Sequence, residues 1–391
     1  MQCSYFDDAR CRSCTLMGMP YAAQLASKDE RCHAALAEAA SSVSWLGPVS
    51  GPESGFRNKA KLVVAGQPGS VTLGILDDSN RGVDLRACGL HEPGLQDLIP
   101  RVADLIDELR LDPYDVPARR GELKHVLLTR SPTGEVMLRF VLRSQRHLAL
   151  LRSRLSVVTE RLPEVAVISV NLQPVHQAIL EGPTEIVLSE SDALSMPVNG
   201  LVLHLRPNSF FQTNTAVAAA LYLQAAEWVD RVQPADVLDL YCGVGGFALH
   251  AARSEGRTGR RVRGVELSPD AVASARRSAA ELRERRPDVG SLVFEVGDAT
   301  DSGILRSLPA GPDSLVIVNP PRRGIGPGLA AQIEDSRVGH LVYSSCNVES
   351  LARDLRALPS FVALEARLFD MFPQSSHHEV AVLLRRTTDR S

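Results

Sequence analysis

The second half of the chain alternates short apolar runs with longer segments of helical periodicity. The apolar runs lie at 236–243, 261–267, 292–298, 314–321, 340–346 and 379–386, and the first expected helix covers 213–232. Near-continuous apolar strands that are separated by helices are typical of a parallel sheet covered on both faces. We therefore predict a Rossmann-like α/β domain over residues 201–391, with an antiparallel final strand.

The first half has a different pattern, which predicts an α+β region over residues 1–200. Short strand-like segments alternate with Gly and Asp/Asn turns between 56 and 91, and a helix is expected from Pro93 to Arg110. The segments 125–131 and 135–144 flank Pro-Thr-Gly and are expected to form a hairpin. A second amphipathic helix over 146–162 and a strand over 165–174 complete the region.

Composition and charge narrow the class of protein without identifying it. The chain has 391 residues, of which 44% are hydrophobic and 23% charged, as in ordinary globular proteins. The net charge of −3 indicates no overall basic field, although a local basic face is sufficient to bind nucleic acid. No apolar run is long enough for a membrane helix, and the polar N-terminus lacks the apolar core of a secretory signal. We therefore expect a cytoplasmic protein with reduced thiols, in which clustered cysteines indicate metal binding or catalysis.

A candidate nucleotide site begins where the first strand of the second half meets a helix. The segment DLYCGVGGFALH contains Gly243, Gly245 and Gly246, which permit a tight turn and a close approach of the backbone to a ligand. Glu266 ends the next strand, where a carboxylate can accept hydrogen bonds from both ribose hydroxyls. Asp298 ends the third strand, within reach of an adenine. These residues fit an NAD site and an S-adenosylmethionine site equally well.

The fourth strand favours a methyltransferase. It ends LVIVNPPRRGIG, and Asn-Pro-Pro at a strand end is typical of methyltransferases that act on planar substrates. The two prolines hold the backbone extended and leave Asn319 to bond a base edge. Enzymes that methylate amino groups usually carry an aromatic residue after the prolines, but Arg322 stands there.

A thiol and a carboxylate follow on the last two strands. Cys346 ends the strand at 340–346, and Glu379 precedes the final strand. A thiolate that adds to C6 of uracil turns C5 into a nucleophile, and a base must then remove the C5 proton. Glu379 is our candidate for that base and Cys346 for the nucleophile. Considered separately, each residue has a simpler structural interpretation. Cys346 would be a buried packing residue, and Glu379 would be a solvent-exposed residue at the start of a strand.

These motifs together resemble the 5-methyluridine RNA methyltransferases over essentially the whole chain. The matching segments are SFFQTN, YCGVGGF, NPPRRG, SSCN and FPQSSHHE, in this order. The N-terminal MQCSYFDDARCRSC is most similar to the branch that methylates a uridine of 23S ribosomal RNA, position 747 in the usual numbering. The resemblance implies an S-adenosylmethionine methyltransferase domain that follows an α+β iron–sulfur domain.

The resemblance also assigns roles to individual residues. Gln212, Tyr241 and Glu266 would bind S-adenosylmethionine, the glycines at 243 and 245 would shape its pocket, and Asn319 would lie where cofactor and uracil meet. Cys346 would be the nucleophile and Glu379 the base. Two positions depart from the common family pattern, since Asn319 replaces an aspartate and Val348 replaces a proline. A neutral amide still offers a donor and an acceptor to O4 and N3–H of uracil.

A cysteine group occupies the N-terminal segment. Cys3, Cys11 and Cys14 form a C-x7-C-x2-C pattern, to which the distant Cys88 adds a fourth thiol. On spacing alone, four thiolates suit zinc and an iron–sulfur cluster equally. The family resemblance implies a 4Fe-4S cluster on these four residues. We treat Cys32 and Cys242 as packing residues.

The expected partner is 23S ribosomal RNA, bound by a monomer with no obligate protein partner. Arg57, Lys59 and Lys61 stand beside Phe56, a mix that suits phosphates and a stacked base, although a solvated strand face is as consistent with it. Arg322 and Arg323 lie nearer the predicted chemistry. Two alternatives remain open: an amino-group methyltransferase of RNA or DNA bases, and a non-catalytic iron–sulfur RNA-binding protein.

Overall fold

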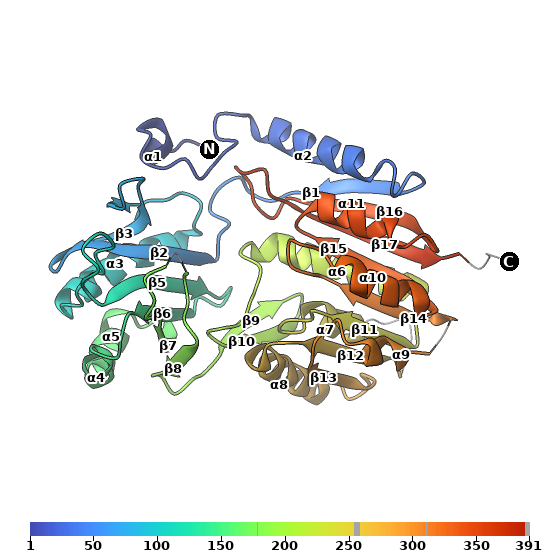
Figure 1. The fold of residues 1–391 in the computed structure, drawn as a ribbon. Coiled ribbons are helices and arrows are strands. Elements are labelled where there is room, and N and C mark those ends of the chain that lie inside the picture. The colour runs from blue at the N-terminus through green and yellow to red at the C-terminus, as the bar shows by residue number, and fades with distance from the viewer. Residues whose placement is uncertain (178, 254–258, 310, 388–391) are drawn as a thin grey trace. The chain divides into compact units, whose positions relative to one another are not determined.

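The chain forms two compact units. The computed structural model describes residues 1–177, 179–253, 259–309 and 311–387 (Figure 1). The first unit consists of Met1–Met17, Pro52–Pro197 and Arg206–Asn208, and the second of Gly18–Gly51, Val198–Leu205 and Ser209–Ser391. The chain thus contributes to the second unit early, forms most of the first unit, and then returns.

The second unit is built on an eight-stranded sheet with the order β1-β16-β17-β15-β14-β11-β12-β13. Its strands are β1 (Ser44–Val49), β11 (Asp236–Leu240), β12 (Arg261–Glu266), β13 (Leu292–Val296), β14 (Gly311–Val318), β15 (Val338–Ser345), β16 (Phe361–Phe369) and β17 (Glu379–Arg386). β11, β12, β13, β14 and β15 are parallel, whereas β17 is antiparallel to β15 and β16. The predicted parallel sheet with an antiparallel final strand is therefore confirmed.

Helices cover both faces of this sheet, as expected for a parallel sheet whose strands are apolar on both sides. They are α2 (Tyr21–Leu36), α6 (Thr215–Val232), α7 (Gly246–Arg253), α8 (Pro269–Arg285), α9 (Ser302–Arg306), α10 (Gly326–Asp335) and α11 (Val348–Arg356). Residues of α2, α10 and α11 share one buried apolar cluster with alternate residues of the strands. Asn214 caps α6, as its side chain accepts a hydrogen bond from the amide of Val217.

The first unit is an α+β arrangement, as predicted. Its seven-stranded sheet has the order β4-β3-β2-β5-β6-β7-β8, in which only β6 and β7 pair in parallel. Its elements are α1 (Ser4–Asp7), β2 (Lys59–Gln67), β3 (Ser70–Leu76), β4 (Gly82–Asp84), α3 (Pro93–Glu108), β5 (Leu123–Arg130), β6 (Val136–Leu142), α4 (Leu148–Ser153), α5 (Leu155–Arg161), β7 (Val165–Leu172) and β8 (Thr184–Val187). Apart from this sheet, β9 (Leu194–Val198) and β10 (Leu201–Leu205) form a two-stranded sheet, of which β10 belongs to the second unit.

The fold differs from the expectation in several places. Residues 18–51 belong to the second unit, whereas the predicted boundary at residue 200 placed them in the first region. β1 contains Gly47 and Pro48, which obscure a strand pattern but are tolerated at the sheet edge that β1 occupies beside β16. β16 itself was not predicted, since its sequence FVALEARLF reads equally well as a helix.

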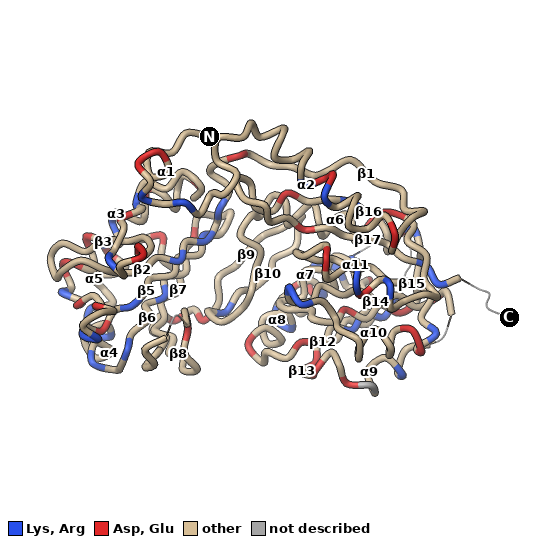
Figure 2. The backbone as a smooth tube through the Cα atoms, turned by 45° about the horizontal axis from the view of Figure 1, so that its top comes forward, with Lys and Arg blue, Asp and Glu red and all other residues tan. Residues whose placement is uncertain are grey.

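Charged residues of both signs are spread along both units (Figure 2). Basic positions recur on β2, β5 and β6 of the first unit, and acidic and basic positions alternate along α8 and α11 of the second. None of the described helices combines the length and the hydropathy that crossing a membrane requires.

Candidate active site

The glycine-rich turn between β11 and α7 leaves room for a ligand close to the backbone. Tyr241, Gly243 and Gly245 all have positive φ angles, of 61°, 54° and 86°. A Cβ atom added at Gly245 would lie 2.8 Å from the Phe294 ring, so only glycine fits there. A Cβ atom added at Gly243 would meet nothing within 4 Å, because the turn faces open space at this point.

Glu266, the last residue of β12, is held against this turn. Its Oε2 accepts a hydrogen bond from the Gly243 amide at 3.2 Å, and its Oε1 accepts one from the Ser268 amide at 2.9 Å. Each carboxylate oxygen keeps a free lone pair. The predicted nucleotide-binding carboxylate and glycine turn are therefore adjacent, in an orientation set by backbone donors.

The remaining predicted cofactor residues include Asp298, Tyr241 and Gln212. Asp298 follows β13, and its Oδ1 accepts hydrogen bonds from the amide and the hydroxyl of Thr300, which hold the pKa of this exposed carboxyl below its usual value. Burial raises the pKa of Tyr241, and the charge of Asp298 raises it further. Gln212 is buried two residues before the cap of α6.

The carboxyl group of Glu379 is buried in a polar niche formed by three strands. Its Oε1 accepts hydrogen bonds from Asn319 Nδ2 at 2.7 Å and from Ser344 Oγ at 2.6 Å. Asn319 follows β14, Ser344 lies in β15, and Glu379 begins β17. Burial raises the pKa of Glu379 to about 7, and the two hydrogen bonds oppose the shift. A carboxyl group with such a pKa can gain and lose a proton near neutral pH.

Cys346 lies beside this carboxyl group, directly after β15. Its thiol is half-buried; burial raises its pKa first, and the charge of Glu379 raises it further, whereas Arg322 lowers it. Asn347 caps α11 with its side chain and donates a hydrogen bond to the carbonyl of Arg322 at 3.2 Å. The guanidinium of Arg322 thus offsets part of this rise, in the direction of the reactive thiolate. The structure brings the predicted nucleophile, the predicted base and Asn319 together.

A buried carboxylate fixes the loop that carries Arg322. Asp354 Oδ2 accepts hydrogen bonds from the Ile325 amide at 2.8 Å and from the Tyr343 hydroxyl at 2.7 Å. Gly324 has a φ of 80°, and a Cβ atom there would lie 2.1 Å from Asp354 Oδ2. The sequence analysis did not identify this support, although an aspartate on the apolar face of α11 was a possible signal.

Asp239 is a second buried carboxyl group that the sequence analysis missed. It lies within β11, and its Oδ2 accepts a hydrogen bond from the Ala248 amide at 3.0 Å. Burial raises its pKa to about 8, and the nearby charge of Glu266 adds to this shift. The sequence signal for this residue was an aspartate within an otherwise apolar strand. Its contact with α7 stabilises the turn that contains Gly243 and Gly245.

The four N-terminal cysteine predictions fall in one neighbourhood of the first unit. The thiols of Cys3, Cys11, Cys14 and Cys88 are free and partly buried. Burial raises the pKa of Cys14 to about 11, and the charges of the other three cysteines add to this rise. Tyr5 accepts a hydrogen bond at its hydroxyl from the Ala87 amide at 3.1 Å, which joins the two chain segments. Within the described residues, however, no three His, Cys, Asp or Glu side chains are arranged to hold a metal ion.

The structure agrees only in part with the prediction that the segment 56–61 contacts RNA. Phe56 is buried, so it is not available to stack on a base, which corrects that expectation. Lys61 is exposed, whereas burial lowers the pKa of Lys59 to about 8. Only part of this segment can therefore present charge to a polyanion.

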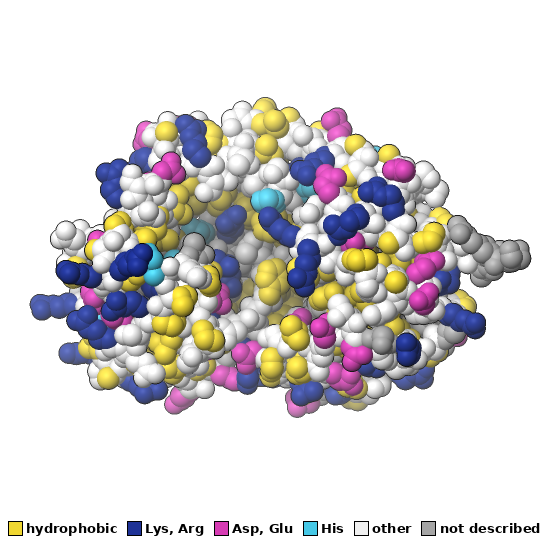
Figure 3. Space-filling view, viewed as in Figure 1, with side chains coloured by type: hydrophobic (Ala, Val, Ile, Leu, Met, Phe, Trp, Pro, Cys, Tyr) yellow, Lys and Arg dark blue, Asp and Glu magenta, His cyan; other side chains and the backbone are white. Residues whose placement is uncertain are grey.

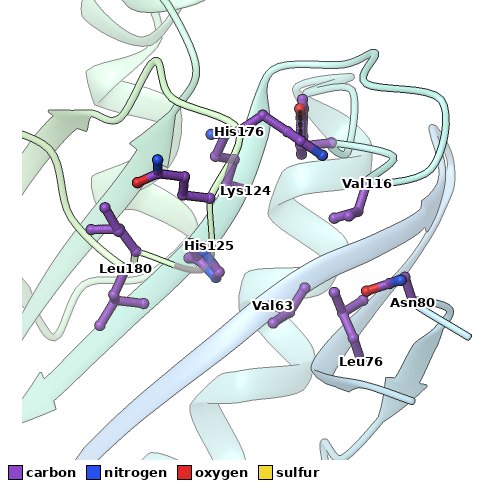
Figure 4. Close-up of a pocket in the computed structure, with 11 residues that line it drawn as sticks. Val63, Leu76, Asn80, Val116, Lys124, His125, His176 and Leu180 are labelled. Carbon is purple, nitrogen blue, oxygen red and sulfur yellow. Dashed lines mark hydrogen bonds between the residues drawn. The ribbon is translucent and has the colours of Figure 1, made fainter. Parts of the chain in front are cut away.

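A separate cavity of about 550 Å³ opens in the first unit (Figure 4). Aliphatic side chains such as Val63 and Leu180 line it together with Lys124, His125 and His176. None of the predicted catalytic or cofactor residues contributes to it.

Comparisons with known proteins agree with the chemistry of the second unit. The sequence profile of the family described as tRNA (Uracil-5-)-methyltransferase matches residues 185–283 and 312–387. A protein of Halothiobacillus neapolitanus, named 23S rRNA (uracil(747)-C(5))-methyltransferase RlmC, is 46% identical over 99% of this chain and 100% of its own length. A protein of Shigella boydii with the same name is 44% identical over 98% of this chain and 99% of its own.

A solved structure extends the agreement to the fold. The tRNA (uracil-54, C5)-methyltransferase of Pyrococcus abyssi, in complex with S-adenosyl-L-homocysteine, has a TM-score of 0.73 and 26% sequence identity. The similarity covers 95% of this chain and 85% of that one. With near-complete coverage by relatives above 40% identity and a matching site, the chain belongs to the RlmC family of RNA uracil-C5-methyltransferases.

Proposed function

We propose that this protein transfers a methyl group from S-adenosylmethionine to C5 of a uridine in 23S ribosomal RNA, at the position that the names of its relatives give as 747. The observation that carries the proposal is the niche in which Cys346, Glu379 and Asn319 meet at the carboxyl ends of β14 and β15. An amino-group methyltransferase needs neither a nucleophilic thiol nor a base with a pKa near 7. The pairing therefore favours methylation at carbon.

The reaction begins at Cys346. Its thiolate adds to C6 of the uracil, which forms an Sγ–C6 bond and moves an electron pair to C5 and O4. Asn319 can donate to O4 and accept from N3–H, and so hold the ring while negative charge develops. S-adenosylmethionine supplies an electrophilic methyl group to C5 when it is bound. The target uridine must leave its stack for the thiol to reach C6.

Glu379 then completes the cycle. Its carboxylate removes the proton from C5, the electron pair restores the C5–C6 double bond, and Sγ leaves as a thiolate. Asn319 and Ser344 hold the carboxyl group through Oε1, so Oε2 is the atom that we assign to the proton. Burial makes the anion a stronger base than an exposed carboxylate would be.

The cofactor site that we propose is the edge formed by β11, β12 and β13. The Glu266 carboxylate, fixed by the Gly243 and Ser268 amides, would accept hydrogen bonds from the ribose hydroxyls. The open space at Gly243 supports this fit. Asp298 would bind the adenine, and Gln212, Tyr241 and Gly245 would complete the pocket.

The direct test incubates purified protein with 23S RNA transcript and S-adenosylmethionine, followed by nuclease digestion and mass analysis. We expect one 5-methyluridine, at a single position in 23S RNA and absent from transfer RNA. Product in transfer RNA alone would retain the chemistry and overturn the target. A methylated amino group in place of 5-methyluridine would overturn the proposed mechanism.

We also propose that Cys3, Cys11, Cys14 and Cys88 hold a 4Fe-4S cluster. Support comes from four free thiols that influence one another's ionisation and from the hydrogen bond between Tyr5 and the Ala87 amide. Soft thiolates are the ligands that such clusters use. The cluster would join the N-terminal segment to the turn at Cys88, as a structural element.

Replacing Cys14 or Cys88 with serine should remove that cluster. We expect protein purified without oxygen to contain about four iron and four sulfide ions per chain. Each serine variant should lose most of both, because one of four ligands is missing. Cys346→Ala is the matched control, since that thiol lies outside the group, and it should retain its iron. Colourless, iron-free protein from anaerobic cells would contradict the proposal.

Basic side chains at the surface of the second unit suit an RNA backbone. Several Arg side chains gather over the part of this unit that contains α10 and α11 (Figure 3). Arg31, Arg353 and Arg356 are each about half-exposed, with side-chain exposures of 50%, 55% and 50%. We propose that these residues, with Arg322 and Arg323, contact phosphates near the target uridine.

We further infer that the protein acts as a monomer in the cytoplasm. All residues of the proposed catalytic and cofactor sites come from the second unit of a single chain. The relatives are named for the modification of ribosomal RNA, and their substrate supports this location.

A further inference from the structure

One face of α2 is polar and buried, although a helix normally buries its apolar face. The side chains of Tyr21, Gln24, Lys28 and Cys32 recur every three or four residues and therefore lie on one side of the helix. We call this set the α2 polar stripe. Three of its members are at most 2% exposed, namely Gln24, Lys28 and Cys32.

Every member of the stripe contacts the loop of residues 370–378, which joins β16 to β17 and ends next to Glu379. Gln24 also donates to the carbonyl of Met19 at 2.9 Å. Lys28 Nζ forms an ion pair with Asp370 Oδ1 at 2.6 Å and donates to the carbonyl of Phe372 at 3.1 Å. The Tyr21 hydroxyl donates to Asp370 Oδ2 at 2.8 Å. The start of the loop is therefore fixed by the ion pair of Lys28 with Asp370 and by hydrogen bonds that Lys28 and Tyr21 donate.

The middle of the loop is held by a pair of amides. Gln24 Nε2 donates to Gln374 Oε1 at 3.0 Å, and the backbone amide of Gln374 donates to Gln24 Oε1 at 3.0 Å. Gln374 has a φ of 66°, in the left-handed region that a non-glycine residue rarely adopts. The reciprocal amide contact stabilises this conformation.

The end of the loop is held by a thiol and an imidazole. Cys32 Sγ lies 3.2 Å from His378 Nε2, and His378 Nδ1 lies 3.2 Å from the carbonyl oxygen of Ser376. A carbonyl can only accept, so Nδ1 carries the proton, and Nε2 accepts from the Cys32 thiol. His378 immediately precedes Glu379, so this contact is the last one before the base.

Burying a polar stripe is costly compared with burying apolar side chains of similar volume, so stability alone does not account for it. We propose that Gln24, Lys28 and Cys32 are positioning residues that hold the 370–378 loop and thereby place the Glu379 carboxyl group for proton removal from C5. This inference rests on the proposed role of Glu379. It gives α2 an indirect role in the chemistry of the second unit.

The test compares addition with release in Cys32→Ala, Cys32→Ser and Gln24→Leu. Lys28→Met is less informative, since it leaves Asp370 buried without its partner and the chain can fail to fold. We expect Cys32→Ala and Gln24→Leu to form the covalent RNA adduct at the wild-type rate with an unchanged KM for RNA. Release of methylated RNA should slow by about 10-fold or more, because a misplacement of about 1 Å can cost up to 10²-fold.

Two controls make the result specific. Cys32→Ser keeps a hydrogen-bond donor to His378 and should restore release to within about twofold of the wild type. Ser27→Ala, on the exposed side of α2, should behave as the wild type does.

Wild-type release in both Cys32→Ala and Gln24→Leu would overturn the inference, as would an equal loss in addition and release. Glu379→Gln is run in parallel. If it too turned over normally, the proposed function of Glu379 would be wrong, and that failure is distinct from a failure of the positioning role alone.

Discussion

Replacing Cys346 with alanine should reduce formation of 5-methyluridine by about 10⁴-fold or more, the scale of loss on removing a catalytic nucleophile. Without the thiol no Sγ–C6 bond forms, and C5 of uracil stays too weak a nucleophile to accept the methyl group. Transfer of a labelled methyl group to 23S RNA, followed over hours at high enzyme concentration, measures the residual rate.

The same variant should still bind its ligands. Glu266 and the glycine turn belong to other strands, so the affinity for S-adenosylmethionine, measured by calorimetry, should change by less than about twofold. RNA affinity should be similarly unaffected. Substantial methylation by Cys346→Ala would show that the thiol is a packing residue, and an amino-group acceptor would then explain the site better.

Glu379→Gln should leave the enzyme covalently bound to its RNA substrate. Glutamine can accept the hydrogen bonds from Asn319 and Ser344 through its Oε1, so the niche should keep its shape. It cannot remove a proton, and turnover should fall by about 10²- to 10⁴-fold, the usual contribution of a general base. Methylated RNA joined to Cys346 should accumulate and appear as a slowly migrating band on a denaturing gel.

The pH dependence of release provides an independent check on this carboxyl group. The base must be ionised, and its pKa is about 7, so wild-type release should slow as the pH falls below 7. The raised pKa of Cys346 affects addition and not release, because the sulfur of the covalent adduct is a thioether with no ionisable proton. In Glu379→Gln, release should no longer depend on pH. A double variant with Cys346→Ala should form no adduct at any pH.

The sequence was sufficient to predict features whose residues are adjacent or follow strand ends. The glycine turn and Glu266 meet as expected because the carboxyl ends of parallel strands share one edge of a sheet. Asn319 and Glu379 meet for a related reason, since β14 and β17 flank β15. The antiparallel direction of β17 was likewise predictable.

The features that were not predicted depend on contacts between distant segments. The polar stripe of α2 resembles a solvated helix face, because nothing local indicates that Lys28 would find Asp370. Asp354 similarly acts through Tyr343 and Ile325, which lie on other elements. Hydrophobic periodicity distinguishes buried from exposed faces only where the buried face is apolar. It therefore predicted neither the α2 polar stripe nor the buried Asp354.

The early position of α2 and β1 in the chain has a consequence for biosynthesis. Lys28 and its partner Asp370 are separated by 342 residues. At a translation rate of about 5–20 residues per second, the ribosome completes the partner about 20 to 70 seconds after the helix. During this interval β1 lacks β16, and the stripe lacks its loop, so a nascent chain exposes an unpaired strand edge. We therefore expect chaperone binding to residues 18–51, or their proteolysis, before the final strands emerge.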